Sequence, residues 1–290
     1  MRDSLSPKTA FVLAGGGSLG AVEVGMLEAL MDYEVHPDLV VGSSVGAING
    51  AFFAGQPDAE GVRRLAEIWR GLRRRDAYPV RPIGAMLGLF SVRNHLADPG
   101  PLRRLIERHM GYRDLEESVI PCHLIATDVL TGAEVILSSG PVVDAVLASA
   151  AIPGLFPPVK LDGRYLADGG LASNTPISAA VSLGATRVIV LPTGFSCNIE
   201  EPPSNSIGMA LHGLALLVAR QLVVDIELFA DAVELRVAPP LCPLPATPYD
   251  FASVGEMIDQ AREATRKWLD QDGLEKMVIP PQMRPYEQTA

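Results

Sequence analysis

A short stretch near the start of the chain has residue types and spacing that could carry acyl-transfer chemistry. Residues 42–46 read Gly-Ser-Ser-Val-Gly, a G-x-S-x-G pattern between an apolar run and a series of small residues. In that context the pattern is typical of a nucleophile elbow, a sharp strand-to-helix turn that exposes the central serine hydroxyl. Ser44 is therefore a candidate nucleophile, with Gly42 and Gly46 letting the turn close. The alternative is that Ser44 only caps a helix.

A second glycine-rich stretch, Gly15-Gly16-Gly17, follows another apolar run, and with Gly20 it gives the spacing G-x-G-x-x-G. That spacing also occurs in dinucleotide-binding folds, where an acidic residue about 20 positions later binds the ribose. Here the second predicted strand ends in Gly42-Ser43 without an acid, which disfavours a dinucleotide cofactor. Glycines allow backbone amides to approach a substrate closely. We therefore interpret Gly15, Gly16 and Gly17 as an oxyanion hole for the serine.

The serine needs a base, and Asp168 is the candidate. It follows a short predicted strand and precedes Gly169 and Gly170. A carboxylate becomes a better base when burial raises its pKa, although Asp-Gly-Gly alone is also an ordinary turn. Histidine is the alternative base, and His212 would fit the chain order Ser, Asp, His. His212 lies inside an apolar helical run, which favours a structural role. Of the other histidines, His36, His109 and His123 lie at or beside the ends of predicted elements, and His95 lies in the predicted insertion.

The elements that must position these residues alternate between strands and helices. Strands are predicted at 10–14, 38–42, 122–127, 133–137, 187–191 and 233–237. Helices are predicted at 20–32, 45–54, 60–72, 101–110, 141–150, 176–183, 207–230 and 253–271. Hairpin turns are expected at Thr131-Gly132 and Asp162-Gly163. This alternation predicts an α/β fold with three layers, α/β/α, around a mainly parallel sheet.

Length and composition are those of a globular enzyme: 290 residues, of which 48% are hydrophobic and 20% charged. We expect one domain over 1–290, with a core at about 8–195 and a C-terminal helical part at about 205–272. An arginine-rich, lid-like insertion is expected at about 73–100.

The formal net charge of −10 argues against a nucleic-acid partner. The charge is uneven, however, because residues 63–108 hold eleven arginines and four acidic residues. Apolar side chains follow an arginine cluster there, which predicts a segment that touches anionic lipid. An ordinary helix packed on the core is the alternative. The candidate lipid-interface residues are Arg73, Arg74, Arg75, Leu87 and Phe90.

Targeting and redox signals favour a cytoplasmic protein, to which the arginine-rich segment adds an expected peripheral membrane contact. The N-terminus has no apolar stretch long enough for a signal peptide. The apolar segment 207–224 is interrupted by polar residues, which favours a buried helix of a soluble core over a membrane span. The three cysteines are scattered, which favours reduced thiols over a zinc site; they are Cys122, Cys197 and Cys242.

Four blocks occur in order: GGGSLG at 15–20, GSSVG at 42–46, ASAAIPGLFPPV at 148–159 and DGG at 168–170. Together they resemble the patatin-like phospholipase family, including its bacterial members, over about residues 8–270. The resemblance implies a patatin-like fold and a serine–aspartate dyad without histidine, here Ser44 and Asp168. It also implies an oxyanion hole at the first block, hydrolysis of fatty acyl esters of phospholipids or related lipids, and no metal or organic cofactor.

One position departs from the family pattern. Family members often carry a basic residue just before the last glycine of the first block, where this chain has Leu19. Neutral esters, lysophospholipids or monoglycerides are then favoured as substrates. Two other functions stay open at this point: a Ser-His-Asp esterase or acyltransferase, and a catalytically inactive lipid-binding or regulatory relative. The oligomeric state is not predicted.

Overall fold

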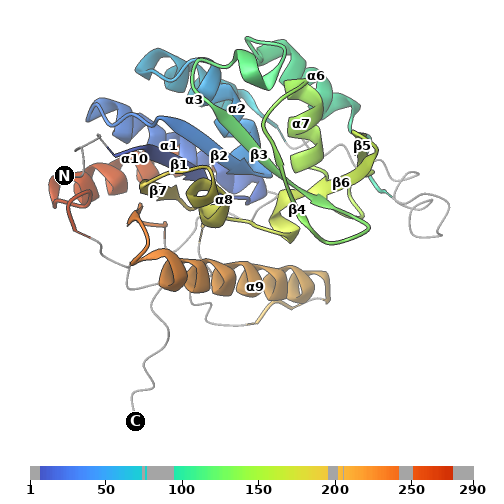
Figure 1. Cartoon of the computed structure of the whole chain (residues 1–290). Helices are drawn as coiled ribbons and strands as arrows, with labels where there is room; N and C mark the ends of the chain where they lie inside the picture. The colour runs from blue at the N-terminus through green and yellow to red at the C-terminus, as the bar shows by residue number, and fades with distance from the viewer. Residues whose placement is uncertain are drawn as a thin grey trace.

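The computed structural model describes residues 7–73, 76, 95–194, 202–204, 206–241 and 251–276. These residues form an eight-stranded, mainly parallel sheet between two layers of helices (Figure 1), which confirms the predicted α/β class. The parallel strands lie in the order β3-β2-β1-β7-β8. Their bounds are β1 Thr9–Leu13, β2 Leu39–Ser43, β3 Cys122–Asp128, β7 Arg187–Leu191 and β8 Glu234–Val237.

Alternate side chains of each strand point to opposite faces of the sheet, and helices cover both faces. Phe11 and Leu13 of β1 point to one face, whereas Ala10 and Val12 point to the other. The first face carries α1 Gly20–Asp32, α2 Val45–Gly55, α3 Ala59–Gly71, α6 Gly100–His109, α7 Val142–Ser149 and α10 Val254–Asp270. The second face carries α8 Ile177–Ser182 and α9 Ser206–Phe229.

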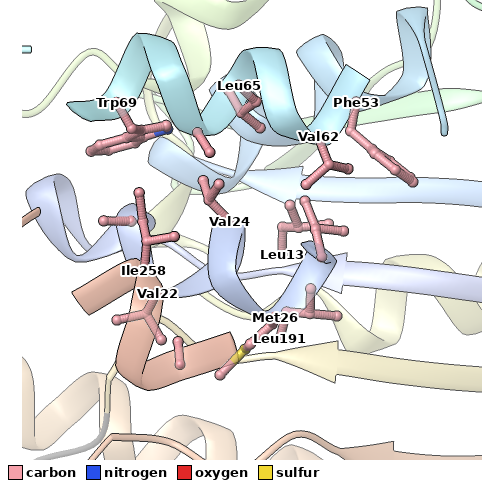
Figure 2. Packing of buried hydrophobic residues seen from close by; sticks show 14 of the residues in the cluster. Leu13, Val22, Val24, Met26, Phe53, Val62, Leu65, Trp69, Leu191 and Ile258 are labelled. Carbon is pink, nitrogen blue, oxygen red and sulfur yellow. The ribbon is translucent and has the colours of Figure 1, made fainter. Parts of the chain in front are cut away.

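A continuous apolar core joins β1 to the helices of the first face. Figure 2 shows the α3 side chains Leu65 and Trp69 above Leu13 of β1. Leu191 of β7 and Met26 of α1 lie lower in the same cluster, with Ile258 of α10 at the left. Phe11 stacks on Phe53 with ring centroids 6.1 Å apart. This packing fixes α1 and α2 directly behind the two turns that carry the candidate site.

Both predicted hairpins are present and add antiparallel strands at one side of the sheet. β4 (Glu134–Leu137) follows a turn that contains Gly132, and β5 (Val159–Leu161) and β6 (Arg164–Asp168) enclose a turn at Asp162-Gly163. Asp162 and Gly163 both have positive φ, 47° and 79°. This is a conformation that Asp and Gly adopt more readily than other residues.

The register of β3 brings the ends of β2 and β6 together. β4 pairs with residues 124–127 of β3, so β2 and β6 must share the opposite edge of that strand. Along this edge Ser43 of β2 pairs with Ile125, and Asp168 of β6 pairs with the next residue of β3. Because β2 is parallel to β3 and β6 is antiparallel to it, the carboxyl ends of β2 and β6 meet end to end.

The structure corrects one expectation and leaves others untested. None of the described helices is long and apolar enough to cross a membrane. The expectation that the 207–224 segment is a buried core helix is wrong for one side of α9, because Leu214 and Leu217 are exposed. Cys122 is a buried free thiol. The other two cysteines and most of the arginine-rich insertion lie outside the described residues.

Candidate active site

Ser44 lies at the sharp turn between β2 and α2, as a nucleophile elbow requires. Its φ of +54° is rare for a residue other than glycine, and such backbone strain persists only where the surroundings enforce it. The turn is crowded, because a Cβ on Gly46 would overlap the carbonyl oxygen of Leu13. The side chain of Ser44 makes no capping hydrogen bond to α2. Its hydroxyl is directed elsewhere.

The hydroxyl of Ser44 donates a hydrogen bond to Oδ2 of Asp168, with an Oγ–Oδ2 distance of 2.7 Å. The contact joins residues 124 positions apart in sequence and follows from the end-to-end meeting of β2 and β6. Both side chains are buried, with 7% and 6% of their surface exposed. The second carboxylate oxygen, Oδ1, accepts from the backbone amide of Gly170 at 2.8 Å. The aspartate is therefore held by a bond on each oxygen.

Burial changes the acidity of this carboxyl. Removal of Asp168 from water raises its pKa from 3.8 to about 6, and the hydrogen bonds from Ser44 and Gly170 partly offset this effect. A carboxylate with such a pKa is a stronger base than a solvent-exposed aspartate, yet it is still largely ionised at neutral pH.

The end of α7 holds both residues of the pair. The backbone amide of Ser44 donates to Oγ of Ser149 at 3.0 Å, and the amide of Asp168 donates to the carbonyl of Ala151 at 3.0 Å. Ser149 is fully buried. Sequence reasoning gave Ser149 no role, although it lies in the block at 148–159, which is the signal that could have drawn attention to it.

The Gly15–Gly17 turn lies beside Ser44. A Cβ built on Gly15 would lie 3.2 Å from the Cβ of Ser44. The amide of Gly15 is already used, since it donates to the carbonyl of Asn174 at 2.9 Å. The carbonyl of Gly15 in turn accepts from Thr193 Oγ1 at 2.6 Å. The amides of Gly16 and Gly17 have no hydrogen-bond partner among the residues the structure describes.

A small apolar pocket opens next to the serine. Ser44 and Gly17 line one part of it, and Trp69 stacks on Phe251 in its wall. Of the residues that the structure describes, none with a charged side chain lines this pocket; its other described lining residues are Val45, Ile48, Leu72, Leu102, Leu105, Ala150, Ile152 and Phe156. A second apolar pocket adjoins the first across Leu102, Ala150 and Phe156.

A buried polar network lies behind the glycine turn. Nδ2 of Asn49 donates to the carbonyl of Gly20 at 2.9 Å and to Oε2 of Glu23 at 2.7 Å. The Asn49 carbonyl accepts from the indole N–H of Trp69 at 2.8 Å. The network ties α1, α2 and α3 together beneath the pocket. Oε1 of Glu23 has no partner in the described part of the chain, and burial raises the pKa of Glu23 well above its ordinary value.

Glu23→Gln is expected to stabilise the protein at alkaline pH. A raised pKa means that the folded state holds the proton, so the contribution of Glu23 to stability is fully present below about pH 4.5 and is lost as pH rises through the folded-state pKa. A neutral glutamine avoids this loss. Relative to wild type, the variant should gain roughly 1.4 kcal/mol for each pH unit between the two pKa values. Urea unfolding of both proteins at pH 5 and pH 8 tests this, and a pH-independent difference would contradict it.

The remaining sequence candidates lie away from the Ser44–Asp168 pair or outside the described residues. Neither Ser44 nor Asp168 is hydrogen-bonded to a histidine among the residues described, and His212 lies on α9 on the other face of the sheet. Leu19 is buried in the core. Arg73 is exposed, whereas Arg74, Arg75, Leu87 and Phe90 fall outside the described residues. In the described ranges no three His, Cys, Asp or Glu side chains could hold a metal ion.

The profile of the patatin-like phospholipase family matches residues 11–181 of this chain. Patatin-like phospholipase domain-containing protein 6 of Homo sapiens is 30% identical over 213 residues, which cover 73% of this chain and 15% of that protein. An uncharacterised NTE family protein of Mycobacterium tuberculosis is 30% identical over 192 residues, covering 66% of this chain and 50% of that protein. The chain thus spans between about one seventh and one half of the length of these relatives.

Solved structures give more distant matches. VipD from Legionella pneumophila has a TM-score of 0.48 and 14% identity, covering 92% of this chain and 67% of that chain. Human GIVD cytosolic phospholipase A2, solved with methyl gamma-linolenyl fluorophosphonate and terbium chloride, has a TM-score of 0.47 and 13% identity, covering 93% of this chain and 60% of that chain.

Proposed function

Because this chain belongs to the patatin-like phospholipase family, we propose that it is a serine acyl hydrolase that cleaves fatty acyl esters of phospholipids, lysophospholipids or related lipids. The observation that carries the proposal is the 2.7 Å hydrogen bond from the hydroxyl of Ser44 to the buried carboxylate of Asp168, at the wall of an apolar pocket. A nucleophile in contact with a base beside an apolar pocket supports hydrolysis of a lipid ester.

The reaction runs in two stages through an acyl-enzyme. Oγ of Ser44 attacks the ester carbonyl while its proton passes to Oδ2 of Asp168, and the tetrahedral intermediate then expels the alcohol, which takes that proton. Water attacks the acyl-enzyme in the second stage and gives a proton to Asp168. That proton returns to Ser44 as the fatty acid leaves, so the enzyme ends in its starting state.

We assign the oxyanion hole to the amides of Gly16 and Gly17. Both amides lack partners among the described residues, and Gly17 lines the same pocket as Ser44. The amide of Gly15 is committed to Asn174, so Gly15 shapes and anchors the turn. α2 begins at Val45, directly after Ser44, and its N-terminus adds a partial positive charge next to the developing oxyanion.

The pocket is suited to bind the acyl chain and offers few contacts to a charged head group. The described residues that line it are apolar apart from Ser44 and the indole of Trp69. Leu19, at the family's frequent basic position, is buried in the core and offers no charge to a phosphate. Neutral esters and lysophospholipids are therefore the first substrates to test.

A fluorophosphonate probe with an alkyl chain tests the proposal directly. We expect a single covalent adduct on Ser44, located by mass spectrometry, and hydrolysis of a lysophospholipid or monoglyceride that the adduct abolishes. A folded protein that forms no adduct but binds lipid would contradict the proposal and favour a lipid-binding role.

Ser149→Ala is expected to lower kcat about tenfold with little change in KM. The variant leaves the buried amide of Ser44 without its acceptor, which costs about 1–3 kcal/mol and loosens the strained turn. Ser149→Thr keeps the hydroxyl and should retain more activity. Ser182→Ala on α8, which removes a hydroxyl bonded to Ala179, is the matched control. Normal kcat in Ser149→Ala would show that the turn holds its shape without this bond.

A further inference from the structure

The peptide unit that joins Gly15 to Gly16 determines the direction of one oxyanion donor. In a trans peptide the carbonyl oxygen and the amide hydrogen point in opposite directions. The carbonyl of Gly15 and the amide of Gly16 belong to the same unit, so a contact that fixes the carbonyl also fixes the amide. A half rotation of this unit would replace the Gly16 amide by the Gly15 carbonyl, which would repel an oxyanion.

The turn itself gives little resistance to that rotation, because neither residue has a side chain. The resistance comes from two neighbours outside the turn. A Cβ built on Gly15 would lie 2.4 Å from Oδ1 of Asn174, and one built on Gly16 would lie 2.3 Å from Oγ1 of Thr193. Asn174 and Thr193 therefore occupy the space that side chains of the turn would take.

These two residues bind the polar groups of Gly15. Oγ1 of Thr193 donates to the Gly15 carbonyl at 2.6 Å, and Nδ2 of Asn174 donates to the same oxygen at 3.3 Å. The amide of Gly15 donates to the backbone carbonyl of Asn174 at 2.9 Å. Thr193 is 3% exposed and Asn174 is 9% exposed. Rotation of the peptide would break both bonds to the carbonyl and leave buried polar groups unpaired, which is costly.

The other carbonyls of the turn are bonded within the protein as well. The carbonyl of Gly16 accepts from the amide of Leu19 at 3.2 Å, and the carbonyl of Gly17 accepts from the amide of Gly20. Within the described residues the amides of Gly16 and Gly17 stay without a partner. A turn whose carbonyls are all bonded and whose successive amides are not is suited to bind an anion.

The two neighbours come from elements that the fold already fixes. Thr193 follows the carboxyl end of β7. Asn174 follows the short helix η3 (Gly169–Leu171), which begins directly after Asp168. The carbonyl of Asp168 accepts from Oγ1 of Thr127 at 2.8 Å, which holds the start of this loop on β3. The candidate base and one anchor of the glycine turn therefore lie on the same short loop.

We propose that Thr193 and Asn174 are positioning residues for the oxyanion hole, and that they hold the Gly15–Gly16 peptide in the orientation that presents the Gly16 amide to the oxyanion. The inference rests on the proposed function and deepens it. The oxyanion exists only after attack on the ester, so loss of this positioning should lower kcat and leave KM unchanged.

The test compares Thr193→Ala with Thr193→Ser, two variants that differ only in the hydroxyl. Thr193→Ser should retain most of the wild-type kcat, and Thr193→Ala should be about tenfold slower with the same KM, because one hydrogen bond to the turn is lost. Thr186→Ala is the matched control, since Thr186 precedes the amino end of β7 and its hydroxyl accepts from the amide of Lys8 at 2.9 Å. It should hydrolyse a soluble ester at the wild-type rate.

A double variant tests whether both residues act on the same carbonyl. Asn174→Ala should cost less than Thr193→Ala, because its side-chain bond to Gly15 is longer. In the double variant the Gly15 carbonyl keeps neither side-chain donor. The loss of kcat should then exceed the product of the two single losses and approach about 10²-fold, the contribution of one oxyanion donor.

An alkyl trifluoromethyl ketone separates positioning from a general structural effect. Oγ of Ser44 adds to the ketone carbon, its proton passes to Asp168, and the ketone oxygen becomes an oxyanion. The inhibition constant of the ketone should rise in Thr193→Ala by the factor by which kcat/KM falls. The inhibition constant of a long-chain alcohol, which forms no oxyanion, should stay the same. The apparent pKa of about 6 in the pH profile should also stay, because the contacts of Asp168 are intact.

Three results would overturn the inference: wild-type kcat in Thr193→Ala, equal losses of kcat in Thr193→Ala and Thr193→Ser, or equal losses of affinity for the ketone and the alcohol. If Thr193→Ala does not fold, Asn174→Ala carries the same comparison of the ketone with the alcohol. A wild type that neither hydrolyses esters nor forms the fluorophosphonate adduct would remove the proposed function and this inference together. An active wild type with an unimpaired Thr193→Ala would remove the inference alone.

Discussion

Ser44→Ala is expected to abolish ester hydrolysis, with a loss of at least about 10⁴-fold in kcat, and to eliminate the fluorophosphonate adduct. The variant removes the atom that forms the acyl-enzyme, and the neighbouring Asp168 cannot replace it, because its oxygens already face the turn and the amide of Gly170. The residual rate acceleration of the variant would come from substrate binding and from the glycine turn, and it should be modest. Steady-state hydrolysis of a soluble ester and of a lysophospholipid measures the loss.

The same position provides a control for folding. Ser44 has a φ of +54°, which costs an alanine as much strain as a serine but costs glycine little. Ser44→Gly should therefore be inactive and yet about 1 kcal/mol more stable than Ser44→Ala by urea unfolding. If Ser44→Ala kept more than a few per cent of the activity while remaining folded, the serine mechanism would be wrong and another nucleophile would have to be sought.

Much of the framework can be predicted from the sequence because local patterns determine it. Apolar runs of strand length, helical periodicity and two glycine-containing turns predict the alternation of elements and both hairpins. The placement of Ser44 after a strand and before a helix also follows from a local pattern, as does the position of Asp168 at the end of a short strand. These features need no knowledge of which strands are neighbours.

The contacts within the candidate site depend on tertiary arrangement and could not be predicted in the same way. The meeting of Ser44 with Asp168 depends on β6 pairing with the far end of β3, a register that no local pattern specifies. The use of the Gly15 amide by Asn174 depends on two segments 159 positions apart. The exposure of Leu217 also could not be predicted, because the sequence of an apolar helix is the same whether or not other parts of the protein cover it.

Asp168→Asn is expected to lower kcat by at least about 10³-fold while preserving the fold. Asparagine can accept the Gly170 amide through its oxygen, which leaves its NH₂ group facing Oγ of Ser44. The hydroxyl would then accept a hydrogen bond instead of donating one, and no base would remain to take its proton. The fluorophosphonate adduct should form much more slowly in the variant, and labelling at the wild-type rate would exclude Asp168 as the base.

As pH rises and Asp168 loses its proton, the activity of the enzyme should increase and its folding stability should decrease. Wild-type kcat/KM should rise with pH to a plateau with an apparent pKa of about 6, because only the carboxylate accepts the proton of Ser44. Since the folded state raises this pKa from 3.8, the same group gives stability that is complete below pH 3.8 and is lost as pH rises through about 6. The neutral asparagine does not undergo that loss. The unfolding free energy of Asp168→Asn should therefore equal that of wild type near pH 4 and exceed it by up to about 3 kcal/mol at pH 8.

The two possible results of this comparison have different meanings. An inactive variant that is also more stable than wild type at pH 8 would mean that the buried base is kept for catalysis at the expense of folding stability. A variant that is less stable at pH 8 would mean that the contacts of the carboxylate outweigh the cost of its burial.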